Sequence, residues 1–265
     1  MEKQHSEFEN LESYSDLEKT VDILLSPGGC PWDREQTHES LKRNLIEECY
    51  ELIEAIENED ISNMVEELGD ILMQVVFHIN IGQRSGKFAG ADVFKHINNK
   101  LINRHPHVFA GGETRSADEV KAQWEEIKQQ EKKDKGNNSR LDSIPKSLPA
   151  LAYAQLVQDR SHLAGFDWDD YSGVIDKVAE EINELSHAVN SEERIEELGD
   201  ILFSLVNVGR WLDIQVEDCL RKANSKFQRR FTHMEEMCRQ RNISLSGLSI
   251  IDKQTLWDAA KLSVG

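Results

Sequence analysis

The sequence predicts an all-α protein built from two copies of one helical unit, and three observations support this. Apolar residues recur at helical spacing over most of the 265 residues, and very little of the chain alternates as a strand would. The heptapeptide EELGDIL occurs at residues 66–72 and again, letter for letter, at residues 196–202. Further features flank both copies in the same order, as a tandem duplication produces. We therefore expect two helical-bundle domains in tandem.

The helices of the first unit are predicted where apolar residues follow a helical period between polar turns. They cover residues 41–57, 61–84, 91–104 and 117–132. The third is expected to stop after Arg104, because Pro106 in the tripeptide His105-Pro106-His107 lacks the amide hydrogen that a continuing helix needs.

The helices of the second unit are predicted from the same periodicity. They cover residues 148–162, 173–189, 192–212, 216–240 and 253–261. A segment rich in Gly, Asn, Ser, Pro and charged residues separates the two units. The expected organisation is a flexible tail over residues 1–14, a first domain over 15–132, a linker over 133–147 and a second domain over 148–265.

Composition and charge exclude several classes of function. The net charge of −18 argues against binding nucleic acid through a basic surface. No apolar run reaches the roughly 18 residues of a membrane span, and the acidic, polar N-terminus is unlike a signal peptide. Four cysteines without CxxC spacing are typical of reduced thiols in the cytoplasm. We expect a cytoplasmic protein that binds neither nucleic acid nor membrane.

Each unit carries two acidic pairs, three residues apart, on neighbouring predicted helices. At 100° per residue, both members of each pair lie at the edge of the apolar stripe of their helix. If the two stripes pack together, the four carboxylates converge. The pairs are Glu48/Glu51 with Glu67/Asp70 in the first unit, and Glu181/Glu184 with Glu197/Asp200 in the second.

Clustered carboxylates keep their charge only beside a cation, and oxygen ligands favour Mg²⁺ or Mn²⁺ over zinc. Gly69 and Gly199 each cost their helix roughly 1 kcal/mol relative to alanine, which suggests that a ligand approaches there. The plainer alternative is a set of solvated acids on amphipathic helices. A di-iron bundle is less well supported, because Glu184–His187 is an ExxH spacing that the first unit lacks.

Basic and aromatic residues recur downstream of both acidic clusters. A Lys–Arg pair four residues apart suits a phosphate clamp, although a solubilising helix face has the same pattern. The tryptophans that follow are candidates to stack on a base or to anchor a helix in the core. These features are Lys100/Arg104 and Trp124/Lys128 in the first unit, and Lys226/Arg230 and Trp257/Lys261 in the second.

Two features near the acids differ between the units. Lys177 lies one turn before Glu181 and can reach a phosphate, whereas Asn44 takes that register in the first unit. Turn-rich loops precede the first acidic helix of each unit, PGGCPWD at residues 27–33 and GFDWDD at residues 165–170. Either loop is a candidate to line a base pocket.

These motifs resemble the MazG family of nucleoside triphosphate pyrophosphohydrolases. The resemblance rests on EExxE followed by ExxD, together with CPWD, RHPHVF, IPKSLPAL, GFDW and KxxRRF, from about residue 17 to 262. It implies two MazG-like helical domains, usually in a homodimer, that hydrolyse nucleoside triphosphates to the monophosphate and pyrophosphate with Mg²⁺.

The resemblance also assigns residues to roles. It places metal ligands at Glu181, Glu184, Glu197 and Asp200, and a second metal site at Glu48, Glu51, Glu67 and Asp70. It places nucleotide contacts at Lys177, Lys226, Arg230, Trp257 and Lys261. We expect Glu197, Lys226 and Arg230 to act in catalysis. The outer acids of the doublets are Glu47, Glu66, Glu180 and Glu196, and one of them is a candidate to orient the attacking water. We count Glu180 among the catalytic candidates and Glu196 among the substrate contacts, and the sequence leaves open which residue activates the water.

The expected reaction is water attack on a phosphorus of the triphosphate, mainly in the C-terminal domain. Attack at the α-phosphorus follows from the resemblance and not from the residues. The alternative is a non-catalytic protein that binds Mg²⁺–NTP for regulation or scaffolding. The sequence leaves open the preferred NTP or dNTP, canonical or not, and whether the N-terminal domain is active.

Overall fold

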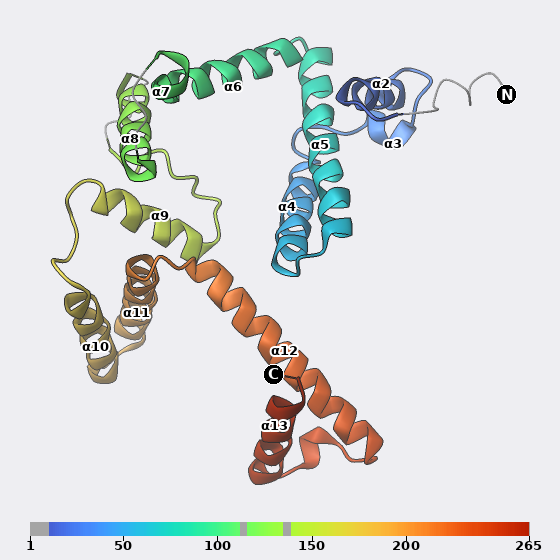
Figure 1. Cartoon of the computed structure of the whole chain (residues 1–265). Helices are drawn as coiled ribbons and strands as arrows, with labels where there is room; N and C mark the ends of the chain where they lie inside the picture. Colours follow the sequence, from blue (N-terminus) through green and yellow to red (C-terminus); the bar gives the residue numbers. More distant parts are fainter. Residues whose placement is uncertain (1–10, 112–115, 135–138, 265) are drawn as a thin grey trace. The chain divides into compact units, whose positions relative to one another are not determined.

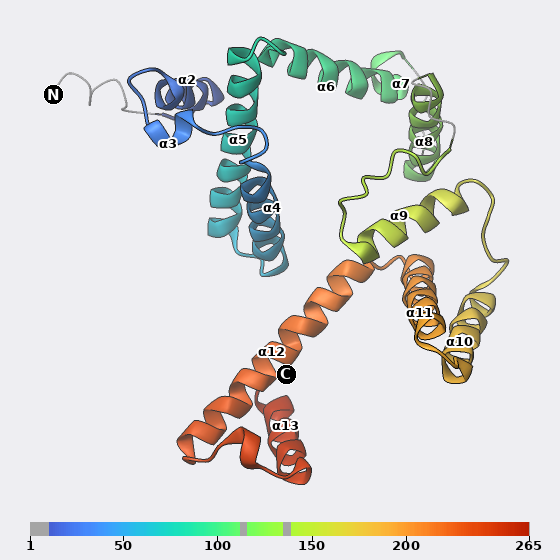
Figure 2. The same cartoon turned by 180° about the vertical axis from the view of Figure 1, so that it is seen from behind.

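The computed structural model describes residues 11–111, 116–134 and 139–264, and within these ranges the chain contains helices and no strand. The predicted all-α class is therefore confirmed. The chain divides into two compact units, Met1–Ile127 and Lys128–Gly265, and each is considered by itself. Figures 1 and 2 show the helices of both units. None of the helices in the described part combines the length and hydrophobicity needed to cross a membrane.

The first unit is organised around one helical hairpin. Its helices are α2 (Tyr14–Leu25), α3 (Pro31–Arg34), α4 (Lys42–Glu57), α5 (Ile61–Arg84), α6 (Gly90–Arg104), α7 (Pro106–Phe109) and most of α8 (Ala117–Asp134). Helix α4 packs along α5, and α2 packs against the second half of α5. Val21 and Leu25 of α2 form the core there with Val76 and Phe77 of α5.

The second unit repeats the hairpin. Its helices are α9 (Ala150–His162), α10 (Tyr171–His187), α11 (Ser191–Trp211), α12 (Val216–Gln240) and α13 (Ile250–Val264), with a 3₁₀ turn η2 (Leu245–Gly247). Helix α10 packs along α11, α9 crosses α11, and α13 folds back on α12 (Figures 1 and 2). Met234 and Cys238 of α12 form a separate core with Leu256 and Ala260 of α13.

The helix that carries EELGDIL begins in the same way in both units. Asp60 Oδ1 accepts a hydrogen bond from Asn63 N at 3.1 Å at the start of α5. Asn190 Oδ1 accepts one from Glu193 N at 2.9 Å at the start of α11. Each side chain satisfies one backbone donor that the first turn leaves unpaired. The two caps lie at the same distance before EELGDIL, so they set the acids at equivalent positions.

The apolar stripe beside the acids is less buried than the sequence pattern predicts. Leu68 and Leu72 of α5 are each 48% exposed, and their counterparts Leu198 and Leu202 of α11 are 51% and 47% exposed. The buried residues of α5, such as Val76 and Phe77, lie on the part that meets α2. Each hairpin therefore buries its apolar stripe only partly, because the partner helix covers only one side of the helix and leaves the rest of the stripe exposed.

The domain limits stay a prediction, and the structure gives the helices that lie near them. Residues 1–10 of the predicted tail and residues 135–138 of the predicted linker lie outside the described residues. Helix α2 begins at Tyr14, and α8 continues to Asp134, two residues beyond the predicted end of the first domain. Helix α2 was not predicted at all.

Candidate metal and nucleotide site

Three carboxylates of the second unit meet at the α10–α11 hairpin. Glu181 of α10 and Glu197 and Asp200 of α11 each offer an oxygen, and these oxygens lie within 4.8 Å of one another. Antiparallel packing brings the two helices side by side, and the spacing of three residues keeps Glu197 and Asp200 on one face. Glu181 is only 4% exposed, so its charge needs compensation.

The first unit forms the same arrangement. Glu48 of α4 lies with Glu67 and Asp70 of α5, again within 4.8 Å. The fourth predicted acid, Glu51 here and Glu184 in the second unit, does not belong to the set of three that the described residues form. Both acids nevertheless act on the cluster, because each raises the pKa of a neighbouring carboxyl.

The pKa values show that the clustered charges are unfavourable without a cation. Burial, a hydrogen bond with Glu51 and the charges of Asp70, Glu51 and Glu67 raise the pKa of Glu48 to about 7. Burial and the charges of Glu184, Glu181 and Asp200 raise the pKa of Glu197. A divalent cation would reverse this repulsion, so the donor set fits a hard metal ion such as Mg²⁺.

Lys177 neutralises part of the second cluster. Its Nζ lies 2.8 Å from Glu180 Oε1 and 2.7 Å from Glu181 Oε1. Hydrogen bonds to these two acids raise the pKa of Lys177. The structure thus places two predicted site residues, Lys177 and the outer acid Glu180, directly beside the buried acid Glu181. Glu196 contributes charge that raises the pKa of Glu197.

A cavity of about 540 Å³ opens beside these acids, between α9, the following loop, α10 and α11. One end carries Lys177, Glu181 and Asp200. The rest of its lining mixes aromatic and polar side chains, as pockets for small molecules do. These are Gln158, Ser161, Phe166, Asp167, Trp168, Phe203, Ser204, Asn207 and Arg210.

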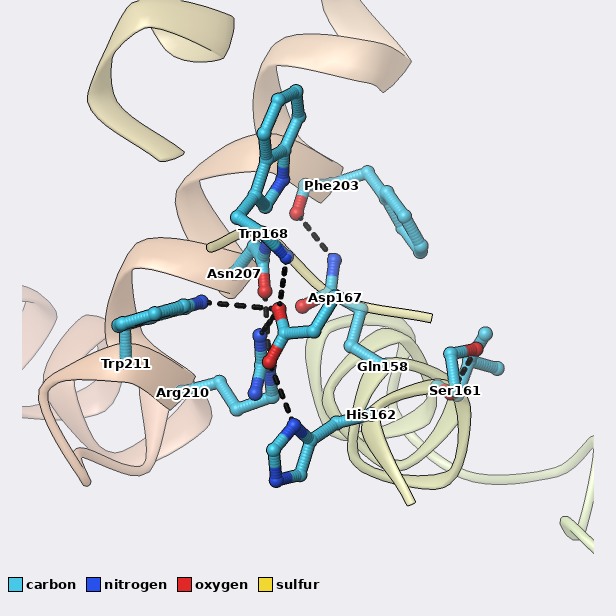
Figure 3. A network of polar contacts seen from close by, with 10 residues as sticks. Gln158, Ser161, His162, Asp167, Trp168, Phe203, Asn207, Arg210 and Trp211 are labelled. Carbon is cyan, nitrogen blue, oxygen red and sulfur yellow. Dashed lines mark hydrogen bonds and ion pairs between the residues drawn. The ribbon is translucent and has the colours of Figure 1, made fainter. Parts of the chain in front are cut away.

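The GFDW loop is held in place by Asp167 (Figure 3). Its carboxylate accepts hydrogen bonds from the Arg210 guanidinium, from Trp211 Nε1 at 3.2 Å and from Trp168 N at 2.9 Å, and it contacts His162 Nδ1 at 2.6 Å. Burial alone would raise the pKa of Asp167, but the bonds from Arg210, Trp168 and His162 outweigh burial and lower it. The neighbours of Asp167 on both sides, Phe166 and Trp168, line the cavity.

Sequence reasoning identified the GFDW loop as a candidate pocket wall, but it missed the residues that line the cavity from α9 and α11. Gln158, Asn207 and Arg210 are polar residues on amphipathic helices and belong to no repeated motif. For Asn207 and Arg210 the one usable signal was their position two to three turns after Asp200, on the face of the acids. Gln158 gives no signal, because only the fold brings α9 across α11.

The basic and aromatic residues predicted downstream of the second cluster lie on α12 and α13, and none belongs to the cavity lining. They are Lys226, Arg230, Trp257 and Lys261. The Arg230 guanidinium lies 5.9 Å from the ring centre of Trp257, and Phe227 lies 5.1 Å from the same ring. Trp257 also packs against the core of the α12–α13 pair, and Lys261 pairs with Asp258 at 2.9 Å. In the first unit Arg104 lies 5.5 Å from Trp124 in the same way.

The end of the cavity away from the acids has no counterpart among the described residues of the first unit. With EELGDIL aligned, Asn207 of α11 corresponds to Phe77 of α5, and Ser204 corresponds to Gln74. Phe77 is buried among Val21, Leu25, Leu41 and Val76. The cavity described near the first cluster measures about 290 Å³ and lies at the other end of the hairpin. It is lined by Glu51, Glu54, Ala55, Asn58, Asp60, Asn63 and Glu67.

Fold and site together define a class: an all-α protein with two acid-lined hairpins suited to a divalent cation. Residues 36–109 and 170–235 both match the MazG nucleotide pyrophosphohydrolase domain. The chain belongs to the MazG nucleotide pyrophosphohydrolase family. This confirms the family and the tandem repeat that the motifs predicted, and with them the prediction of an enzyme.

Individual relatives align over most of the chain. A Thermotoga maritima protein named nucleoside triphosphate pyrophosphohydrolase/pyrophosphatase MazG is 47% identical over 94% of this chain and 95% of its own. The nucleoside triphosphate pyrophosphohydrolase of Escherichia coli K12 is 42% identical over 88% of this chain and 90% of its own. The uncharacterized protein YabN of Bacillus subtilis is 45% identical over 94% of this chain and 51% of its own.

Proposed function

We propose that the protein hydrolyses nucleoside triphosphates to the monophosphate and pyrophosphate, mainly in its C-terminal domain. The observation that carries the proposal is that the cavity beside the second acidic cluster shares Glu181 and Asp200 with it. A nucleoside in the cavity would therefore direct its phosphates at the metal-binding acids. The names of the Thermotoga maritima and Escherichia coli relatives support the same substrate class.

We assign Glu181, Glu184, Glu197 and Asp200 as ligands of Mg²⁺, with Mn²⁺ as a substitute of similar ligand preference. When bound, the ion would supply charge neutralisation at the phosphates and lower the pKa of a bound water. Glu180, displaced from Lys177, would orient the attacking water. Lys177 is already held at the edge of the cluster by Glu180 and Glu181, and it would transfer its contact to a phosphate oxygen.

The remaining predicted contacts, Lys226, Arg230, Trp257 and Lys261, lie on α12 and α13. The two lysines and the arginine carry positive charge in an acidic protein. We propose that Lys226 and Arg230 stabilise negative charge that develops on the phosphates, as cations positioned for a transition state do. Glu196, next to Glu197, would contact the substrate.

The proposal that the second domain is the catalytic one comes from a difference between the two hairpins. Both keep three converging acids, but Phe77, buried in an apolar core, takes the position of the cavity-lining Asn207 of the second unit. We therefore propose domains over residues 15–132 and 148–265, with the second as the catalytic one and Glu48, Glu51, Glu67 and Asp70 as a second metal site. Four unpaired cysteines are consistent with a cytoplasmic location.

The test is pyrophosphate release from each of the common NTPs and dNTPs with Mg²⁺. We expect Glu197→Gln to lower release at least about 100-fold, because it removes a charge from the cluster at the reacting phosphates. Glu192→Gln removes a charge from the same helix outside the cluster and should have little effect. Binding of nucleotide without turnover by the wild-type protein would instead favour a regulatory or scaffolding role.

The division is tested by Glu67→Gln, which makes the equivalent change in the first unit. Loss of activity in Glu197→Gln with retention in Glu67→Gln is expected. Equal losses in the two variants would contradict a catalytic C-terminal domain and a structural or regulatory N-terminal one.

A further inference from the structure

One buried polar atom in the cavity of the second unit has no bonding partner among the described residues. Gln158 on α9 is 7% exposed, and its Oε1 makes no hydrogen bond there. Buried polar atoms are almost always paired, and an unpaired one in a native structure calls for an explanation. Because Gln158 lines the cavity, a ligand in the cavity can supply the missing partner.

The orientation of the Gln158 amide follows from its other contact. Gln158 Nε2 donates to the backbone oxygen of Phe203 at 2.7 Å, as Figure 3 shows. A backbone oxygen can only accept, so the amide nitrogen must face Phe203 and the oxygen must face away from it. The cavity therefore meets a hydrogen-bond acceptor at this point and not a donor.

A second amide in the cavity has the opposite polarity. Asn207 Oδ1 accepts from Arg210 Nε at 2.9 Å, which leaves its Nδ2 amino group as the donor that Asn207 can offer. The aromatic side chains of Trp168 and Phe203 complete this end of the cavity, and the acids and Lys177 lie at the other. An acceptor and a donor between aromatic side chains match the edge of a nucleobase, where N–H groups and acceptors lie side by side.

We propose that Gln158 Oε1 reads the base of the substrate by accepting a hydrogen bond from a ring or exocyclic N–H, with Asn207 Nδ2 donating to the neighbouring acceptor. The inference rests on the proposed function. It makes Gln158 a specificity-determining residue. A base without an N–H at this edge leaves the buried Gln158 Oε1 without a hydrogen-bond donor, and the site therefore rejects that base.

The test compares triphosphates with analogues in which an exocyclic amino group is absent or a ring N–H is methylated. The pairs are ATP with purine riboside triphosphate, ITP with N1-methyl-ITP, and UTP with N3-methyl-UTP. For each base that the cavity accepts, we expect the wild-type kcat/KM to be at least about 10-fold higher for the parent triphosphate than for its analogue. The analogue would leave a buried acceptor unpaired, and this is costly. In Gln158→Met, which keeps the length of the side chain, the ratio should fall close to one.

Gln155 provides the matched control. It lies one turn earlier on α9 and is equally buried, but both ends of its amide are paired, with Ile214 O at 3.0 Å and Val216 N at 3.0 Å. Gln155→Met should lower the melting temperature and leave the parent-to-analogue ratio at the wild-type value. This separates a change in base recognition from a loss of packing.

The outcomes distinguish the two proposals. Release of pyrophosphate from none of the parent triphosphates would overturn the proposed function. Release with equal kcat/KM for parent and analogue in every wild-type pair would overturn the role of Gln158 alone, and this measurement needs no variant to fold. A wild-type preference that persists unchanged in Gln158→Met would overturn it as well.

Discussion

Lys177 determines the state of the second acidic cluster when no other cation is bound. Its ammonium group lies between Glu180 and Glu181 and compensates the charge of a carboxylate that is 4% exposed. The first unit has Asn44 at this register, and there the pKa of Glu48 rises to about 7. The charge repulsion within the cluster is therefore reduced by a lysine in the second unit and by a raised carboxyl pKa in the first, because one neighbouring residue differs.

Asp167 offers a test of how the pocket loop is held. Asp167→Asn should lower the free energy of unfolding at pH 7 by about 2 kcal/mol, below the roughly 3–5 kcal/mol of a fully buried pair, because solvent reaches part of the site. Arg210, 11% exposed at its side chain, would then lack its carboxylate partner. Chemical denaturation of both proteins measures the difference.

The pH dependence of that difference has a definite sign. The folded-state pKa of Asp167 lies below its ordinary value of 3.8, so the stabilisation is complete above pH 3.8 and is lost as the pH falls through the lower folded-state value. The gap between wild type and Asp167→Asn should narrow only below pH 3.8. A gap that closes between pH 7 and 5 would contradict the ion pair with Arg210.

At the scale of single helices, periodicity predicted the elements well. Helices α5 and α12 have the predicted limits, and α4 begins one residue late. Helix α2 was missed although its apolar residues follow a helical period and Ser13 caps its first turn. These apolar residues pack against α5. Helix α6 ends at Arg104 as predicted, and Pro106 then opens the short helix α7, where its missing amide hydrogen costs no bond.

The glycine within EELGDIL, Gly69 or Gly199, lowers the stability of its own helix. A Cβ at Gly69 or Gly199 would meet no described atom within 4 Å, so packing inside the protein does not require glycine there. Gly199→Ala should therefore raise the free energy of unfolding by about 1 kcal/mol, through helix propensity alone.

Activity should move in the opposite direction. Gly199 lies between Glu197 and Asp200, and a methyl group there would crowd a ligand held by both. We expect Gly199→Ala to be more stable in thermal unfolding and less active in pyrophosphate release. A variant that gains stability and keeps full activity would show that the glycine has no role at the ligand.

At the scale of the whole molecule, the exposed apolar stripes call for a partner. Leu198, Leu202 and Leu205 of α11 are 44–51% exposed, and Leu68, Leu72 and Val75 of α5 are 40–48% exposed at equivalent positions. Contiguous apolar surface of this kind marks an interaction site. A second copy of the chain presents the same stripe to itself, as twofold association requires, so we propose a homodimer.

The homodimer has a direct test in light scattering coupled to size-exclusion chromatography. The wild-type chain should elute with twice the mass of one chain, and Leu198→Glu/Leu202→Glu should shift it to the mass of a monomer, because burying two carboxylates opposes association. Phe166→Glu changes an apolar side chain that is 84% exposed in the pocket loop, and it should leave the mass unchanged. A wild-type monomer would contradict the proposal.

The sequence by itself determined the helical class, the duplication and three of the four predicted acids that converge in each hairpin, since periodicity and a three-residue spacing are local properties of a helix. It also indicated that a hard cation belongs among the acids. Only the tertiary structure decided that Gln158, Asn207 and Arg210 share one cavity with Glu181, and that Phe77 sits at the equivalent place in the first unit. A cavity is formed by segments distant in sequence, and no local pattern records which of them will meet.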